Sequence, residues 1–425
     1  MSTEQRVLAH LESWRRRGCL QGSVALFAPD GRVVEASGGL ADPAHGIANG
    51  AQTRYRIGSL SKSFTAAAVL QLVDAGHLAL DTPLARFLPT LPNAREITVL
   101  QLLRHRAGLA NFTAAPDYWP LRMRLPQQPA ELIAWAGALP PVAPPDSGET
   151  YSNTGYLLLA AIVEQLAGQD FDSYRRERLF EPLGLSSLVV DDGRRLITDA
   201  ARGLHHDGSW AYAEPMDMSV AWGVFDLVAT AGDIGRWLVA LQAGLVLSAR
   251  STALMLDVEE RDMACGFCVG RWTLAGRERR LAQHFGDVNG FFAYMSVLPG
   301  GGAVVVLANA FGLPVERLAR ELAQLAAGDQ PAALLRPSAT APAVFASGRY
   351  RAEDGSVLEI LRHGGTVSLR STRRYGVTMC CPLFRADDAA AAAVSLVLPE
   401  TLEASTAGCL RWTDAEGRIR ELFPV

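Results

Sequence analysis

The periodicity of hydrophobic positions changes along the chain, and the changes predict the order of its elements. Between residues 7 and 14, apolar side chains recur at helical spacing among polar ones, which predicts an amphipathic helix. Strand patterns follow at 23–27 and 32–36 around a Pro-Asp-Gly turn, and again at 290–298 and 303–307 around a glycine-rich turn. Each pair of strands predicts a hairpin.

The middle of the chain carries helical periodicity instead. Strands at both ends of a helical middle predict an α/β (α+β) sandwich, in which an antiparallel sheet unites the two hairpins and is flanked by helices. We expect part of the middle to form an all-helical lobe. The predicted helices are 61–76, 99–106, 130–136, 155–167, 171–178 and 233–243, and another opens at Pro314.

A change of composition near residue 328 predicts a domain boundary. Residues 1–328 form the first domain, and 329–345, rich in Ala, Pro, Gly and Gln, form a linker. Residues 346–425 contain short strand patterns separated by turns, which predict a small antiparallel β-barrel-like domain. The strand patterns lie at 357–361, 366–369, 376–379, 394–398, 409–412 and 418–423.

Composition excludes several classes of function. The 425 residues carry a net charge of −4 and no basic tract, which argues against nucleic acid and membranes as partners. No apolar run reaches the roughly 18 residues that span a bilayer, and the N-terminal residues lack a secretory pattern. Cys265 and Cys268 have a metal-like spacing but no second pair nearby. We therefore expect a cytoplasmic protein with reduced cysteines and no metal or cofactor.

The strongest chemical signal is a single lysine. Of the 40 basic side chains, Lys62 is the one lysine and the rest are arginine. Arginine stays protonated, whereas a buried lysine can lose its proton, so position 62 is a candidate for acid–base chemistry. Ser59 lies three residues earlier and would share one helix face with Lys62. A serine becomes a nucleophile when a neighbouring base removes its proton.

Further motifs follow in order, and together they resemble a known family. Gly58-Ser-Leu-Ser-Lys62, Tyr151-Ser-Asn153 and His284-Phe-Gly286 are similar to the three motifs of serine β-lactamases and penicillin-binding proteins, in particular the class C-like branch. Supporting segments at 102–109, 179–185 and 230–233 also fit, so the resemblance covers roughly residues 5 to 328.

The resemblance implies roles for the motif residues. Ser59 would form an acyl-enzyme, and Lys62 would lower the pKa of Tyr151, whose phenolate would act as general base. Asn153 would hydrogen-bond both the acyl-side amide of the substrate and Lys62. The backbone N–H groups of Ser59 and Asp287 would form the oxyanion hole.

Other residues are assigned to the walls of the cleft. His284 and Gly286 would lie on the strand that edges it. Aromatic candidates for the lining are Phe291 and Phe292, next to the third motif, and Trp119 and Trp222, for which core packing is the simpler interpretation.

The third motif departs from that of many β-lactamases, which have a lysine where this chain has His284. A mostly neutral histidine weakens the case for penicillin hydrolysis and favours the D-aminopeptidases, D-amino-acid amidases and esterases of the same branch. The C-terminal segment, from Gly348-Arg-Tyr350, resembles the lipocalin-like domain appended to some stereospecific peptidases and to penicillin-binding-protein-type thioesterases. Arg373 and Arg374 would offer a cation there, although two solvated surface arginines are the simpler interpretation.

The sequence thus predicts a serine hydrolase or acyltransferase acting on a peptide- or amino-acid-derived amide, ester or thioester. Its partner would be a small acyl or peptidyl substrate, or a thioester bound to a carrier protein, and its acceptor would be water, an amine or an alcohol. Two alternatives stay open: a thioesterase or transacylase of natural-product biosynthesis, and a non-catalytic binding protein of the same fold. An α/β-hydrolase is set aside because the chain has no Gly-x-Ser-x-Gly elbow.

Overall fold

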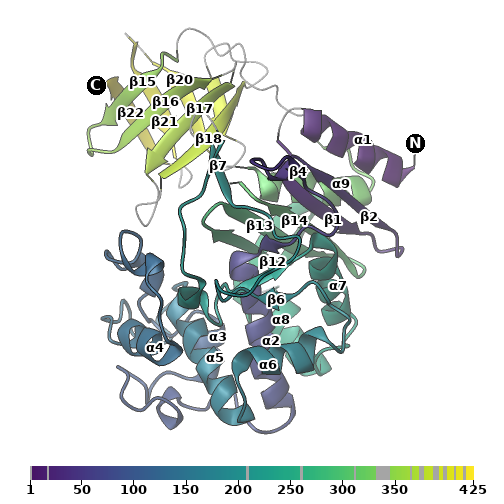
Figure 1. Ribbon diagram of the computed structural model, residues 1–425, viewed down its shortest axis with the longest axis vertical. Coiled ribbons are helices and arrows are strands. Elements are labelled where there is room, and N and C mark those ends of the chain that lie inside the picture. The colour runs from purple at the N-terminus through teal and green to yellow at the C-terminus, as the bar shows by residue number, and fades with distance from the viewer. Residues whose placement is uncertain are drawn as a thin grey trace.

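The computed structural model describes most of the chain and places a large mixed α/β part beside a smaller β part (Figure 1). The described residues are 2–16, 19–206, 210–258, 262–310, 313–331, 345–363, 366–372, 378–385, 392–395, 400–405, 408–414 and 418–425. Within these ranges, no helix is long and apolar enough to cross a membrane. The predicted mixed α/β fold with antiparallel sheets is confirmed.

A seven-stranded antiparallel sheet forms the centre of the larger part, in the order β10-β11-β12-β13-β14-β1-β2. β1 from the N-terminal hairpin pairs with β14 from the late hairpin, with Gly22 opposite Ala308. The prediction that one sheet unites both hairpins is therefore confirmed. The strands are β1 (Gly22–Phe27), β2 (Val33–Gly38), β10 (Met263–Ala264), β11 (Phe267–Leu274), β12 (Arg277–Val288), β13 (Phe291–Leu298) and β14 (Gly302–Ala308).

Helices cover both faces of this sheet, so its strands are buried on two sides. On β13, Phe292 and Tyr294 join the core beneath α1 (Thr3–Arg16) and α9 (Val315–Ala326). The alternate residues Ala293 and Met295 face the other core, which includes α2, α7 and α8. These helices are α2 (Ser61–Asp74), α7 (Ala231–Gln242) and α8 (Ala249–Leu256).

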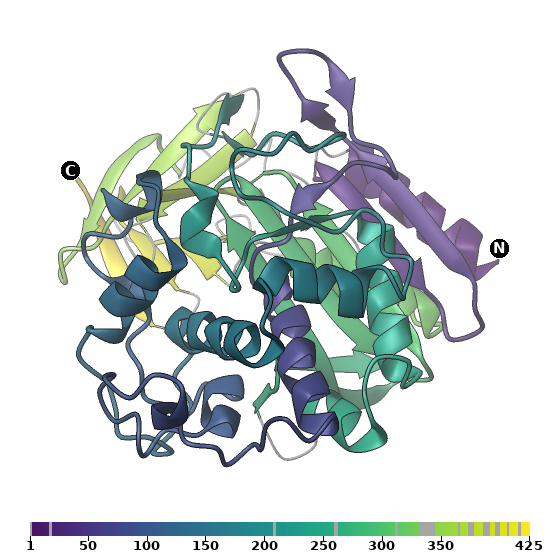
Figure 2. The same ribbon diagram turned by 60° about the horizontal axis from the view of Figure 1, so that its bottom comes forward.

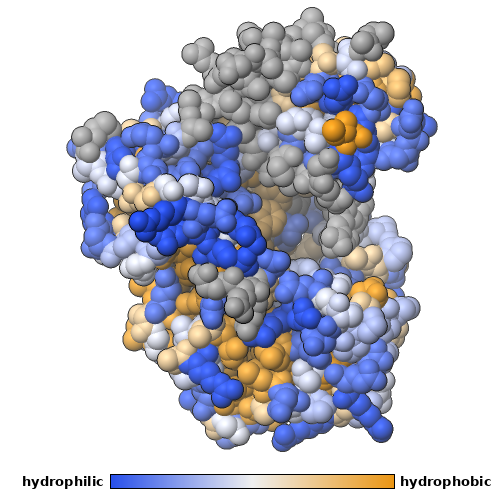
Figure 3. Space-filling model, turned by 180° about the vertical axis from the view of Figure 1, so that it is seen from behind, coloured by the Kyte–Doolittle hydropathy of each residue, from blue (hydrophilic) through white to orange (hydrophobic). Residues whose placement is uncertain are grey.

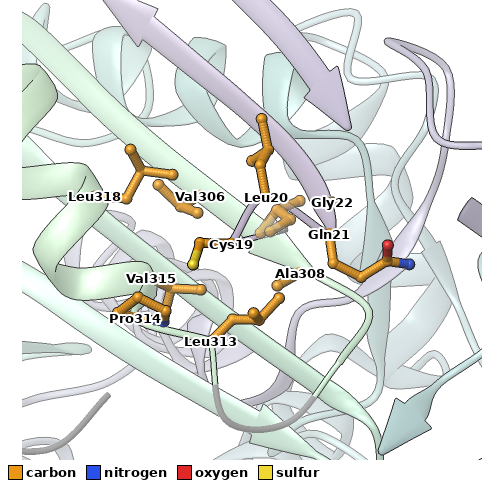
Figure 4. A pocket seen from close by; sticks show the side chains of 11 residues that line it. Cys19, Leu20, Gln21, Gly22, Val306, Ala308, Leu313, Pro314, Val315 and Leu318 are labelled. Atoms are coloured by element: carbon orange, nitrogen blue, oxygen red, sulfur yellow. The ribbon is translucent and has the colours of Figure 1, made fainter. Parts of the chain in front are cut away.

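The N-terminal helix α1 is anchored by three of its four predicted apolar positions. Val7, Leu11 and Trp14 are buried against α9, whereas Leu8 is 43% exposed. Just beyond α1, Cys19 and neighbouring side chains close around a cavity of only about 10 Å³ between β14 and the start of α9 (Figure 4). This junction is close-packed, as expected of a protein interior.

The helical middle packs against α2. Helix α5 begins at Asn153, the last residue of the second motif, and lies beside α2 in the middle of the molecule (Figure 2). Its neighbours are α3 (Val99–Leu103), α4 (Pro129–Gly137) and α6 (Phe171–Arg175), and α5 itself spans Asn153–Ala167. A π-helical turn (Arg176–Phe180) continues α6, and single 3-10 turns are η1 (Gly58–Leu60), η2 (Leu84–Arg86), η3 (Phe112–Ala114), η4 (Arg122–Arg124) and η6 (Met218–Ala221).

Short strands connect the helical middle to the sheet. They form small ladders in which β5 and β6 both pair with β9, β3 pairs with β4, and β7 pairs with β8. The bounds are β3 (Leu40–Asp42), β4 (Ile47–Ala48), β5 (Tyr55–Arg56), β6 (Val189–Val190), β7 (Leu204–His206), β8 (Trp210–Tyr212) and β9 (Leu227–Ala229).

The C-terminal part is a closed barrel of eight antiparallel strands with its own apolar core. The first and last strands pair, with Tyr350 opposite Pro424, and Met379 of β18 packs against the core beneath α9. Arg373, Arg374 and most of the predicted linker lie outside the described residues. The strands are β15 (Gly348–Ala352), β16 (Val357–His363), β17 (Thr366–Thr372), β18 (Thr378–Arg385), β19 (Ala392–Ser395), β20 (Glu400–Ala404), β21 (Leu410–Thr413) and β22 (Ile419–Pro424).

Candidate active site

The candidate nucleophile lies where the sheet meets the helical middle. η1 runs directly into α2, so Ser59 precedes the first turn of α2 and Lys62 lies one turn further on the same face. Gly58 has φ of 57° and a Cβ there would lie 2.8 Å from the backbone nitrogen of Asp287. Glycine at position 58 therefore lets η1 approach strand β12 closely.

Two polar groups converge on the hydroxyl of Ser59. Lys62 Nζ donates a hydrogen bond to Ser59 Oγ at 2.9 Å, and Tyr151 OH donates to the same oxygen at 2.8 Å. Lys62 Nζ also donates to the carbonyl of Val224 at 3.3 Å. The structure thus brings together the three residues that the motifs indicated, with both candidate bases in direct contact with the candidate nucleophile.

The interior surroundings of Lys62 favour its neutral form. Its side chain is completely buried, and this burial lowers the pKa of the ammonium group to about 7. The negative charges of Asp287 and Asp226 act in the opposite direction and raise this pKa. A lysine with a pKa near neutrality can exchange a proton with a neighbouring hydroxyl.

The second motif is held in place by His105. The His105 ring stacks on Tyr151 at a centroid distance of 4.4 Å, and its Nδ1 accepts the N–H of Ser152 at 3.1 Å. Burial lowers the pKa of His105 well below its usual value, so the ring is neutral and can accept this bond. His105 was not identified as a site residue from the sequence, because the segment 102–109 that contains it indicated only a structural role.

Asn153 differs from its expected arrangement. Its side-chain NH₂ donates to Thr113 Oγ1 at 2.9 Å rather than to Lys62, and its backbone N–H donates to Asn111 Oδ1 at 3.1 Å. Its buried Oδ1 has no hydrogen-bond partner among the described residues. A buried acceptor without a partner is available to a donor on a bound molecule.

Strand β12 supplies the opposite wall. His284 is buried, and burial lowers its pKa to about 3, so the ring is neutral; its Nδ1 donates to the Phe285 carbonyl at 2.7 Å. A Cβ on Gly286 would lie 2.2 Å from the Ile57 carbonyl and 3.1 Å from the Ser59 nitrogen. The third motif therefore contributes close backbone approach and a neutral ring, not a fixed cation.

A cavity of about 280 Å³ opens beside Ser59. Figure 3 shows the surface hollowed between the smaller β part and the rest of the molecule. The described residues that line the cavity are Ser59, Asn111, Thr113, Tyr118, Trp119, Tyr151, Asn153, Met216, Phe225, Cys268, His284, Phe285, Asp287 and Val288.

The four aromatic residues that were candidates for the cleft lining lie in different parts of the structure. Trp119 lines this cavity, whereas Phe291 lines a neighbouring cavity of about 390 Å³. Trp222 packs on Phe171, and Phe292 belongs to the core beneath α9. Tyr118 and Phe225 complete the aromatic wall, although nothing in their local sequence indicated it.

Among the described residues, no group of three or more His, Cys, Asp and Glu side chains is arranged to hold a metal ion. Cys265 is buried, Cys268 lies at the cavity, and neither forms a disulfide.

Comparison with known proteins agrees with this geometry. The family model described as Beta-lactamase matches residues 8–329, and the chain belongs to this family. It is 31% identical over 368 residues to penicillin-binding protein 4 of Amycolatopsis lactamdurans, covering 79% of this chain and 93% of that protein. The teichoic acid D-alanine hydrolase of Staphylococcus aureus is 23% identical over 248 residues, which is 58% of this chain and 60% of that protein.

Solved structures extend the comparison. The D-amino acid amidase from Ochrobactrum anthropi SV3, solved with L-phenylalanine amide, superposes with a TM-score of 0.63 at 26% identity and covers 72% of this chain and 91% of its own. The octameric penicillin-binding protein homologue from Pyrococcus abyssi shares the fold over 99% of both chains, with a TM-score of 0.67 at 24% identity. The fold is thus the serine-hydrolase type of the β-lactamases and penicillin-binding proteins.

Proposed function

We propose that this protein is a serine hydrolase that forms an acyl-enzyme at Ser59 on a small amide or ester derived from an amino acid or peptide. The observation that carries the proposal is the double contact of Ser59 Oγ with Lys62 Nζ and Tyr151 OH, at 2.9 and 2.8 Å. Nucleophilic serines need such a neighbouring base. A purely structural hydrogen-bond cluster would not require a buried lysine with a pKa near 7.

The proposed reaction has two halves. Neutral Lys62, directly or through Tyr151, takes the Ser59 proton while Oγ bonds to the carbonyl carbon of the substrate. The backbone N–H groups of Ser59 and Asp287 stabilise the resulting oxyanion. When the carbon–nitrogen or carbon–oxygen bond breaks, the same proton passes to the leaving group. Water then attacks the ester and regenerates Ser59 by the reverse proton transfers.

The neutral His284 bears on the choice of substrate. No arginine or lysine is among the described residues that line the cavity. A substrate carboxylate would therefore meet no fixed cation beside the third motif, which supports amides and esters without an acidic group over penicillins. The relatives named D-amino acid amidase and D-alanine hydrolase agree with this substrate class.

The test is the mass of the intact protein after mixing with D- and L-aminoacyl esters, amino amides and a peptidyl thioester. We expect the wild type to gain one acyl group on the peptide that contains Ser59, and Ser59→Ala to gain none. Ser63→Ala is the matched control, because Ser63 hydrogen-bonds the Leu60 carbonyl and does not line the cavity. It should label like the wild type.

Products measured with and without added amine distinguish hydrolysis from acyl transfer. Labelling of Ser59→Ala at the wild-type rate would exclude the proposed nucleophile. Absence of turnover by every probe, combined with tight binding of one of them, would favour a binding protein of the same fold.

A further inference from the structure

The cavity beside Ser59 contains one carboxylate that the proposed reaction does not use. The backbone of Asp287 serves the oxyanion hole, but its side chain is exposed and lines the cavity. None of the described residues forms an ion pair with this carboxylate. A carboxylate that lines a cavity without an ionic partner is available to a cationic group on a bound molecule.

The position of Asp287 on β12 separates its side chain from the sheet core. Along this strand the buried residues Ala282, His284 and Val288 alternate with more exposed ones, and Asp287 belongs to the exposed set. Its carboxylate therefore points away from the core that contains Val288. The surrounding protein raises the pKa of Asp287, and the charge of Lys62 lowers it.

Other unpaired polar atoms lie around the same cavity. Asn153 Oδ1, an acceptor, and Tyr118 OH are both buried and have no hydrogen-bond partner among the described residues. Carboxylate, amide oxygen and phenol oxygen all accept hydrogen bonds. Trp119 and Phe225 add apolar wall. The cavity thus combines a charged acceptor, neutral acceptors and aromatic surface.

We infer that the Asp287 carboxylate binds a primary ammonium group on the acyl portion of the substrate, so that the enzyme selects free aminoacyl compounds over N-acylated ones. An ammonium group has three donors and a positive charge, which suit one carboxylate and further neutral acceptors. This inference rests on the proposed acyl-serine function and names its substrate class more narrowly.

Recognition and catalysis are coupled by charge in this arrangement. Asp287 and Lys62 interact electrostatically across the site. An ammonium ion that pairs with Asp287 removes the negative charge that favours protonated Lys62. Binding of the correct substrate therefore favours the neutral lysine that the reaction requires.

The experiment compares three matched esters that differ only at the α-position: D- or L-phenylalanine ethyl ester, its N-acetyl form, and ethyl 3-phenylpropanoate. Selectivity is the ratio of kcat/KM for the free amine to kcat/KM for each of the other two. We expect a ratio well above one for the wild type and a fall of about 10- to 100-fold in Asp287→Asn, as for loss of a hydrogen bond to a charged group.

Glu149→Gln is the control, because Glu149 is an exposed carboxylate close to the motif that does not line the cavity. Its selectivity should equal that of the wild type. An unchanged ratio in Asp287→Asn would overturn the inference, and so would a wild type that prefers the N-acetyl ester.

A binding measurement that needs no turnover tests this inference independently of the proposed function. Calorimetry of 2-phenylethylammonium with Ser59→Ala should show binding that weakens about 10-fold or more when Asp287→Asn is added. Equal affinities would contradict recognition by Asp287. A positive result here together with no Ser59 labelling would leave the recognition site intact while the proposed acyl-enzyme fails.

Discussion

Arg175 and Asp226 form a two-point ion pair in the interior, with N–O distances of 2.9 and 2.7 Å and both side chains almost fully buried. Asp226 Oδ2 also accepts the backbone N–H of Gly223 at 2.8 Å. The segment between these residues contains the Val224 carbonyl that accepts a bond from Lys62. The ion pair therefore fixes the backbone that positions the candidate base.

Breaking this pair should affect both stability and the site. We expect Asp226→Asn to lower the free energy of unfolding by about 3–5 kcal/mol, because Arg175 is left buried without its full partner. The negative charge of Asp226 also raises the Lys62 pKa, so its removal should move the pH–activity curve toward lower pH. Denaturant unfolding and a pH profile of kcat/KM measure the two effects.

Asp146→Asn is the matched control for that variant. Arg106 and Asp146 form an exposed pair, with 33% and 62% of their side chains accessible. Loss of an exposed pair should cost less than about 1 kcal/mol and leave the pH profile unchanged. Equal losses of stability in both variants would contradict a special role for the buried pair.

The pH dependence of activity tests which form of Lys62 is the base. Because burial lowers the Lys62 pKa to about 7, neutral lysine should become available as the pH rises through that value. We expect kcat/KM for a neutral ester to rise about tenfold per pH unit below 7 and to level off above it. A profile that falls above pH 7 would instead indicate a protonated lysine beside a Tyr151 phenolate.

Replacing the lysine should reveal the cost of burying it. The folded-state pKa of about 7 lies below the usual value of 10.5, so the unfolded chain binds more protons between these values and stability rises with pH there. Lys62→Met should therefore be more stable than the wild type near pH 6, by up to a few kcal/mol. The advantage should shrink as the pH approaches 10, as measured by denaturant unfolding at several pH values, while activity is lost throughout.

The thiol of Cys268 offers a chemical probe of the cavity. Burial raises the pKa of Cys268 to about 11, so little of it is thiolate at neutral pH. We expect alkylation by iodoacetamide to be slow at pH 7, to accelerate with pH, and to abolish turnover by filling the cavity. Cys268→Ala should be resistant to this inactivation, and rapid inactivation of that variant would place the reactive thiol elsewhere.

The local pattern of apolar and polar residues predicted much of the fold, because many helices and strands bury one regular face. The helix at α2, the two hairpins and their shared sheet followed from periodicity. β11 and the first half of β12 were missed, because the four charged residues Arg277 to Arg280 interrupt the apolar pattern at the exposed start of β12. The barrel strand β20 was missed because it is only five residues long and contains two glutamates, which are uncommon in strands.

The site was predictable where chemistry is concentrated in motifs and hidden where it depends on packing. Ser59, Lys62 and Tyr151 were found from one lysine and two short motifs, and the structure places them in contact. The ring of His105 acquires its role from a stacking contact with Tyr151, 46 residues later. Phe291 adjoins the third motif in sequence, yet the turn before β13 directs it into the neighbouring cavity.

The pairing of β1 with β14 has a consequence for synthesis of the chain. Gly22 meets its partner Ala308 only after nearly the whole larger part has left the ribosome. At 5–20 residues per second, the first hairpin waits roughly a quarter of a minute to a minute for its central neighbour. During that interval the apolar edge of β1 is unpaired, so nascent chains are the form of this protein most exposed to aggregation and most dependent on chaperones.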